Sequence, residues 1–154
     1  AKVHTSRTGM ALDTFQLVHP RIETDDQGGY RDLISLVETQ LVLAMGSDRP
    51  LPEPSRGRVS RRVKSFPITP RVSLQPDERA QRWLLSVSTS DHSGLLYAIA
   101  RVLARHGINL QLAKVSTLGE RVEDTFLVDG PALQHTRTQL QIETELLDAL
   151  APVR

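Results

Sequence analysis

The sequence predicts an α+β fold of the ferredoxin-like βαββαβ type, in which helices pack on one face of an antiparallel sheet. Three observations predict it. Apolar and polar residues alternate over 82–90, as in a half-buried strand, whereas Leu95, Ile99 and Val102 recur at helical spacing. Two more alternating stretches follow, and then a second helical pattern that runs to Leu150. Elements in this order bury one face of a sheet against a layer of helices.

The first predicted elements are a strand over 82–90, a tight loop over 91–94 and a helix that begins near Leu95. Asp, Ser and Gly in the loop are residues that commonly start helices. Gly107 stands where the helix should end, because glycine readily adopts the left-handed conformation that is common just after a helix.

The second strand is predicted over 108–117, and its apolar phase shifts at Ala113, which indicates a bulge. A turn at Gly119 leads to a third strand over 122–128. Thr136 is placed to cap the last helix. The predicted order is therefore β-α-β-β-α.

The fourth strand of this fold has too little chain left for it after the last helix, where only 151–154 remain. We therefore expect 62–66 or 71–74 to supply this edge of the sheet from upstream. Pro67 and Pro70 suit an edge strand or a corner, because proline cannot donate to a central ladder.

The chain also contains an internal repeat. The block AKVHT at 1–5 recurs as AKVST at 113–117, and each block is followed by Asp-Thr-Phe, at 13–15 and at 124–126. The distance from block to tripeptide is one residue longer in the first copy, and we place that residue in a turn. The first copy continues into a helical pattern of Leu33, Val37, Leu41 and Ala44 that Gly46 closes. We expect two copies of one module, of which the first lacks its front half.

A half-module leaves the apolar face of its strands uncovered, which costs about 25 cal/mol for each square ångström exposed. We therefore expect the second module or another chain to cover Val3, Leu12, Phe15 and Leu17.

Composition excludes several kinds of function. The 154 residues are 39% apolar and 24% charged, which is typical of a soluble globular protein, and no apolar run is long enough to span a membrane. No secretory signal opens the sequence, so we expect a cytoplasmic protein. The absence of cysteine excludes disulfides, thiolate metal sites and thiol nucleophiles. The histidines are scattered singly, so no metal site is expected.

Charge gives no reason to expect a nucleic-acid partner, because the net charge is only +1. One basic stretch nevertheless occurs around the prolines, and it holds Arg56, Arg58, Arg61, Arg62, Lys64 and Arg71. No aromatic platform for stacked bases lies among the first five of these. The stretch is interpreted as a solvated linker, and contact with an acidic partner surface is the alternative.

The loop Asp91-His92-Ser93-Gly94-Leu95-Leu96 resembles the D-R-P-G-L-L signature of ACT domains, and Gly107-Ile108-Asn109 resembles their G-x-N. The stretch AKVSTLGERVEDTF over 113–126 is similar to the tandem ACT tail of the bacterial PII uridylyltransferase/uridylyl-removing enzymes. The chain departs from the signature at His92 and Ser93, where the family has arginine and proline.

This resemblance implies the organisation of the chain: the back half of a first ACT domain over 1–48, a proline- and arginine-rich linker with edge strands over 49–80, and a second ACT domain over 81–154. It also implies a tail that senses glutamine and forms ACT–ACT homo-oligomers. Uridylyl transfer to the PII protein, and the Mg²⁺ that serves it, would belong to catalytic domains upstream. No catalytic residue and no cofactor site is expected in this chain.

The candidate ligand site is the loop at the start of the predicted helix. The backbone N–H groups of Gly94, Leu95 and Leu96 and the positive end of the helix dipole suit a carboxylate. Asp91 suits an ammonium group, and Asn109 is expected to add an amide contact. His92 replaces the missing arginine as a cation only when it is protonated.

Other interpretations stay open. In one, Asp91 or Ser93 merely caps the helix, Asn109 satisfies a turn and His92 is a surface residue. In a second, the chain is a structural interaction module whose sheets pair edge to edge and bind nothing small. A nucleic-acid-binding regulatory module is a third, which the charge balance disfavours.

Overall fold

The computed structural model describes residues 2–6, 8–16, 22, 26–47, 52–54, 68–78 and 81–151. The strands are β1 (Lys2–Thr5), β2 (Ala11–Thr14), β3 (Arg71–Pro76), β4 (Trp83–Ser90), β5 (Asn109–Lys114), β6 (Thr117–Leu118) and β7 (Arg121–Asp129). The helices are α1 (Gln27–Met45), α3 (Leu95–Arg105) and α4 (Thr136–Leu150), together with the 3-10 helix η1 (Pro131–Gln134). Ala1–Phe15 and Pro54–Arg154 form one compact unit, and Gln16–Glu53 forms a second.

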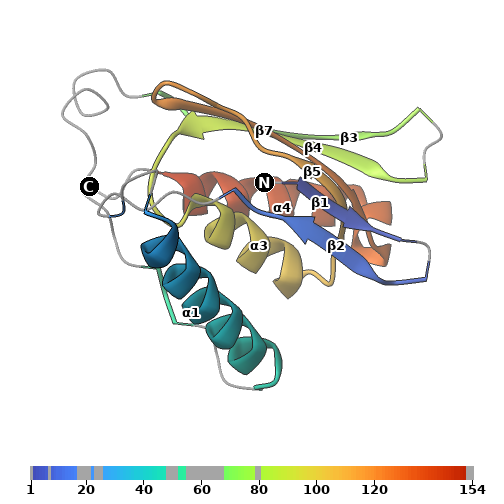
Figure 1. The fold of residues 1–154 in the computed structure, drawn as a ribbon. Helices are drawn as coiled ribbons and strands as arrows, with labels where there is room; N and C mark the ends of the chain where they lie inside the picture. The colour runs from blue at the N-terminus through green and yellow to red at the C-terminus, as the bar shows by residue number, and fades with distance from the viewer. Residues whose placement is uncertain are drawn as a thin grey trace. The chain divides into compact units, whose positions relative to one another are not determined.

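The strands of the first unit form one antiparallel sheet in the order β2-β1-β5-β7-β4-β3, with β6 pairing β7 beside this path. Because β4 and β5 both run antiparallel to β7, they are parallel to each other and flank it. Helices α3 and α4 lie side by side on one face of the sheet (Figure 1). The predicted α+β fold, with helices on one face of an antiparallel sheet, is confirmed.

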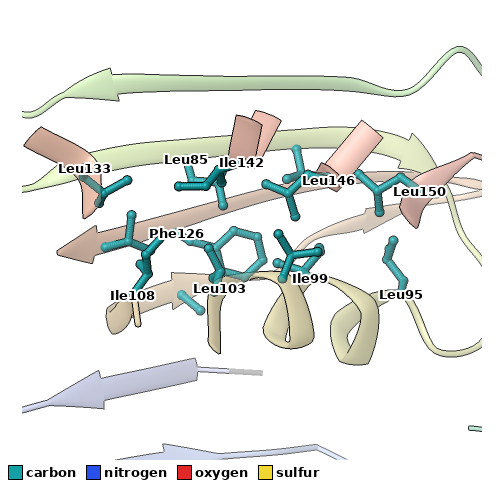
Figure 2. Close-up of a cluster of buried hydrophobic side chains, with 14 of the residues drawn as sticks. Leu85, Leu95, Ile99, Leu103, Ile108, Phe126, Leu133, Ile142, Leu146 and Leu150 are labelled. Carbon is teal, nitrogen blue, oxygen red and sulfur yellow. The ribbon is translucent and has the colours of Figure 1, made fainter. Parts of the chain in front are cut away.

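The core fills the space between this face of the sheet and the two helices (Figure 2). Every second residue of β7 points into it from Val122 to Val128, and Leu85 and Val87 of β4 do the same. The helices contribute Leu95, Ile99, Val102 and Leu103 from α3 and Ile142, Leu146 and Leu150 from α4. Burial of each such aliphatic side chain stabilises the fold by roughly 1.5–3 kcal/mol.

The local elements follow the sequence pattern closely around α3. Strand β4 and helix α3 lie where they were predicted, and Gly107 takes a left-handed φ of +63° just after the end of α3. A register shift between Leu110 and Leu112 in the pairing of β5 with β7 confirms the bulge. The predicted second strand is divided, because β5 ends at Lys114 and pairing resumes in β6.

The cap predicted for the last helix is wrong. Thr136 is the first helical residue of α4, and His135 is the cap. The backbone carbonyl of His135 accepts hydrogen bonds from the N–H groups of Thr138 and Gln139 at 2.9 and 3.0 Å. The chain enters α4 directly from η1, so the helix begins one residue before a Thr136 side chain could cap it.

The fourth strand of the sheet comes from upstream, as predicted. Strand β3 pairs along the outer side of β4, from Arg71 opposite Ser88 to Pro76 opposite Trp83. The backbone N–H of Leu74 donates to Glu143 Oε1 of α4 at 2.8 Å, which ties this edge strand to the helix layer. The alternative segment 62–66, like the basic cluster of 56–64, lies outside the described residues.

The hairpin of β1 and β2 extends the sheet on its other side. Strand β1 pairs with β5, with Lys2 opposite Lys114. The two hairpins share one register, since Lys2 pairs with Thr14 as Lys114 pairs with Thr125. Further along, Thr5 pairs with Ala11, six residues on, whereas Thr117 pairs with Val122, five residues on. The extra residue of the first copy therefore lies in its turn, as predicted.

The expected covering of the first hairpin is only partly confirmed. Val3 is partly buried and packs against the core of the second module. Leu12 and Phe15, however, are 72% and 58% exposed, so the second module does not cover them, and their covering by another chain stays a prediction. The reason is that β2 is the outermost strand of the sheet and pairs only with β1. Leu17 lies outside the described residues.

The second unit contains the predicted helix of the first copy. Helix α1 begins after Asp26, whose Oδ1 accepts a hydrogen bond from the Gly29 N–H at 2.9 Å, and it ends at Gly46. None of its residues is buried, although Leu33 and Val37 of the apolar pattern are half-buried. None of the helices in the described part of the chain is long and apolar enough to cross a membrane.

Candidate ligand site at the start of helix α3

The loop between β4 and α3 is held at both ends. The Asp91 N–H donates to the Glu120 carbonyl at 2.8 Å, which fixes the start of the loop to the turn before β7. The His92 ring lies with Nδ1 3.0 Å from the Ser90 carbonyl, so a protonated Nδ1 donates to it. Gly94 is the N-cap of α3 and has a φ of +84°, a left-handed conformation that glycine adopts without strain.

A pocket of about 270 Å³ opens beside this loop. Its volume lies just below the roughly 300–1,000 Å³ that is typical of ligand pockets, so only a ligand as small as one amino acid suits it. The lining residues come from the loop, the first turn of α3 and the strands beneath, and they are Asp91, His92, Gly94, Leu95, Leu96, Tyr97, Val115, Thr117, Val122 and Asp124.

Backbone donors lie at the start of α3, whose first residues line this pocket. The Leu95 N–H makes a long turn hydrogen bond of 3.4 Å to the His92 carbonyl, whereas the Gly94 and Leu96 N–H groups have no acceptor among the described residues. The positive end of the helix dipole lies at the same place. The Leu95 side chain points into the core and is 5% exposed. Leu95 therefore offers a ligand its backbone N–H, while its side chain packs in the core.

The structure brings most, but not all, of the predicted site residues together. Asp91, His92, Gly94, Leu95 and Leu96 line the pocket, and Ser93 does not. The alternative in which Asp91 or Ser93 caps α3 is also wrong as stated, because Gly94 occupies the cap position.

Asn109 lies elsewhere, which corrects the prediction that it contacts a ligand at this loop. It begins β5 and pairs with Asp129 at the end of β7, whereas the loop follows Ser90, which pairs with Arg121 at the start of β7. Asp129 lies eight residue steps along β7 from Arg121, or about 26 Å at 3.3 Å per residue. The parallel direction of β4 and β5 places the start of one far from the end of the other.

Asp124 is a site residue that sequence reasoning missed. It lies on β7 in the row of inward-facing residues, is 2% exposed and lines the pocket from below. Its Oδ1 accepts a hydrogen bond from the Ser116 N–H at 3.1 Å, and its buried Oδ2 has no partner in the described part of the chain. The alternation Val122-x-Asp124-x-Phe126 could have revealed a carboxylate on the buried face.

The electrostatics of Asp124 follow from this position. Burial is the largest influence and raises the pKa of the carboxyl group above its usual value, and the negative charge of Asp91 raises it further. The hydrogen bond from Ser116 and the positive charge of the N-terminal amino group act in the opposite direction and lower this pKa. The pocket therefore combines donors for an anion at the start of α3 with two carboxylates that can accept from a cation.

Within the described ranges, no group of three or more His, Cys, Asp or Glu side chains could hold a metal ion.

Comparison with known proteins gives two findings. The family model of the ACT domain matches residues 83–143, which run from the start of β4 into α4. Nearly the whole chain matches proteins named bifunctional uridylyltransferase/uridylyl-removing enzyme. It is 55% identical over 152 residues to that of Ralstonia nicotianae, 56% over 151 to that of Cupriavidus pinatubonensis and 52% over 151 to that of Burkholderia mallei.

These matches cover 97–98% of the chain but only 17–18% of each relative. The chain therefore spans less than one fifth of the length of these relatives. No solved structure matches the chain.

Proposed function

From the match of residues 83–143 to the family model of the ACT domain, we propose that the chain is a glutamine-sensing regulatory region of a bifunctional uridylyltransferase/uridylyl-removing enzyme. In this proposal the parent enzyme modifies the PII nitrogen-signalling protein, and its catalysis takes place outside this chain. Identity above 50% over almost the entire chain supports the assignment to this parent.

The observation that carries the proposal is that one small pocket is lined both by hydrogen-bond donors that suit an anion and by a carboxylate that suits a cation. A free amino acid has a carboxylate and an ammonium group close together. The Gly94 and Leu96 N–H groups suit the carboxylate, because a helix N-terminus offers unpaired donors and a favourable dipole. The carboxylate of Asp91 lines the same pocket and suits the ammonium group.

We further propose that the chain holds parts of two ACT domains, over 1–48 and 81–154, joined by a linker over 49–80. The shared register of the β1–β2 and β5–β7 hairpins supports this organisation. Sensing then requires that glutamine bind one arrangement of the parent more tightly than another, since a ligand with equal affinity for both shifts nothing.

Isothermal titration calorimetry of this chain tests the proposal. L-Glutamine is expected to give a saturable heat with one site per chain, and L-glutamate, which replaces the side-chain amide by a carboxylate, is expected to bind more weakly because the pocket already holds Asp91 and Asp124. Asp91→Asn should weaken glutamine binding. Asp148→Asn, which changes an exposed carboxylate on α4 outside the pocket, is the matched control.

A chain that gives no heat with glutamine, although its melting transition shows that it is folded, would exclude this site as a glutamine sensor. Equal loss of binding in Asp91→Asn and Asp148→Asn would show that the loop is not where the ligand binds.

A second candidate function is a structural module that associates through its sheet and binds no small ligand. The pairing of β1 along β5 favours it, because the sheet of the ACT domain is already extended there by main-chain hydrogen bonds. His92 and Ser93 in place of the arginine and proline of the family signature favour it as well. In this case light scattering would show a homo-oligomer, and no amino acid would change its melting temperature.

A further inference from the structure

Two carboxylates line the pocket beside α3, and they differ in burial. Asp91 is exposed, whereas Asp124 is 2% exposed on the central strand β7. We propose that Asp124 Oδ2, together with the carboxylate of Asp91, binds the ammonium nitrogen of an amino-acid ligand and so selects ligands that carry this cation. The inference rests on the proposed function and adds a specificity-determining residue to it.

The unpartnered oxygen is the first argument. Oδ1 of Asp124 is satisfied by the Ser116 N–H, but Oδ2 is buried and has no hydrogen-bond partner among the described residues. A buried polar atom without a partner costs roughly 1–3 kcal/mol, and more when it is charged, so native structures rarely retain one without a reason. A ligand N–H donor in the pocket would supply the missing hydrogen bond.

The second argument is how rigidly this oxygen is held. Asp124 lies in the inward row of β7 between Val122 and Phe126, which are 2% and 3% exposed, and the hydrogen bond from Ser116 fixes its other oxygen. A group held in this way loses little entropy when a ligand binds. Asp91, in contrast, is exposed on a loop, where water competes for its carboxylate.

The third argument is the chemistry of an ammonium group bound to a carboxylate. An ammonium–carboxylate hydrogen bond is charge-assisted, and it is strengthened where water is excluded. The donors at the start of α3 and Asp124 line one pocket, so a single zwitterion can satisfy both. The carboxylate of the ligand is then bound by the helix terminus and its ammonium group by β7.

The test compares two ligands and two variants by isothermal titration calorimetry. The ligands are L-glutamine and 4-carbamoylbutanoate, which is glutamine without its amino group. The variants are Asp124→Asn, which keeps an oxygen for the Ser116 N–H but removes the charge, and Asp13→Asn. Asp13 is the matched control, because it occupies the repeat position of Asp124 in β2, is exposed and does not line this pocket.

We expect Asp124→Asn to weaken glutamine binding by roughly tenfold or more, as the loss of a charge-assisted hydrogen bond implies. Binding of 4-carbamoylbutanoate should be weak and equal in the unchanged chain and in Asp124→Asn, and Asp13→Asn should bind both ligands as the unchanged chain does. Equal glutamine affinity in Asp124→Asn and the unchanged chain overturns the inference but leaves the sensor function intact. Equal loss for both ligands shows a structural role and also overturns it.

A failure of the proposed function itself has a different signature, since the unchanged chain would then give no heat with glutamine and both conclusions would fall together. A second measurement needs no variant. Carbon-13 NMR of the aspartate carboxyl groups should show the pKa of Asp124 falling when glutamine is added, because a nearby cation stabilises the charged form. An unchanged titration of Asp124 in the glutamine-saturated chain contradicts direct contact.

Discussion

Lys2 of β1 and Lys114 of β5 lie directly opposite each other in the sheet, and they occupy the same position in the two copies of the repeated Ala-Lys-Val block. The neighbouring pair joins Val3 to Ala113, the repeat equivalent of Ala1. The register is therefore that of a two-fold axis passing between the two lysines, as in an isologous dimer interface. The strand order β2-β1-β5-β7 has the same symmetry.

This pair of like charges is a local weakness. Both lysines are exposed, and like charges directly opposite each other on neighbouring strands are destabilising. Lys114→Glu should therefore raise the free energy of unfolding by about 0.2–1 kcal/mol, measured by urea denaturation at low salt. The double variant Lys2→Glu/Lys114→Glu restores a like-charge pair and should lose this gain. The gain should also shrink at high salt, where exposed charges are screened.

Gly94 should be sensitive to any side chain. Its φ of +84° is left-handed, which costs an L-residue roughly 1–2 kcal/mol, and an added Cβ would lie 2.7 Å from Pro54 Cγ. Gly94→Ala should therefore lower the free energy of unfolding by at least that amount. Asp91→Ala is the control in the same loop. Because Asp91 is not the cap of α3, this change should stay within about 0.5 kcal/mol. A large loss in Asp91→Ala would restore the capping interpretation.

Asp124 makes the stability of the chain depend on pH. Its pKa is raised in the folded chain, chiefly by burial, and Asp91 is the charged neighbour that adds to this effect. The folded state therefore binds this proton more tightly than the unfolded state, so the contribution of Asp124 is most favourable below its usual pKa of 3.8 and is lost as pH rises through the folded value.

At pH 7, Asp124→Asn should consequently be more stable than the unchanged chain, because the amide carries no charge that is buried on folding. Chemical denaturation at a series of pH values measures the difference, which should shrink as the solution is made more acidic. A constant difference at every pH would mean that the charge of Asp124 is not its cause.

The core between the sheet and α4 should tolerate truncation poorly. Leu146 is 0% exposed, and Leu146→Ala should cost about 2–5 kcal/mol through lost burial and a residual cavity. Leu140 lies on the same helix but is 58% exposed, so Leu140→Ala should change stability by less than about 0.5 kcal/mol. Similar losses in the two variants, compared by thermal unfolding, would contradict the packing of α4 shown here.

Periodicity predicted the parts of the fold that depend on local pattern. The alternation in β4 and the helical spacing from Leu95 led to the correct elements, because these residues pack against the sheet and helices in the order the chain supplies them. The exposure of Leu12 and Phe15 could not be predicted in this way, because it depends on which strand ends the sheet.

The site was harder to predict, for two physical reasons. Asn109 was assigned to the loop because it was expected on an adjoining strand, but a strand that follows a crossover helix begins at the far end of the sheet. Asp124 was noticed only as part of a repeated tripeptide, and its importance depends on burial and on a hydrogen bond from Ser116, which no single-residue pattern reveals.

The outer strand β3 has a practical consequence for anyone who trims this protein. A fragment cut at residue 81 would remove Arg71–Pro76, leave the edge of β4 without its neighbour and break the link from Leu74 to Glu143. Such a fragment would expose a bare strand edge that invites aggregation. The smallest piece worth expressing for ligand studies therefore starts before Arg71.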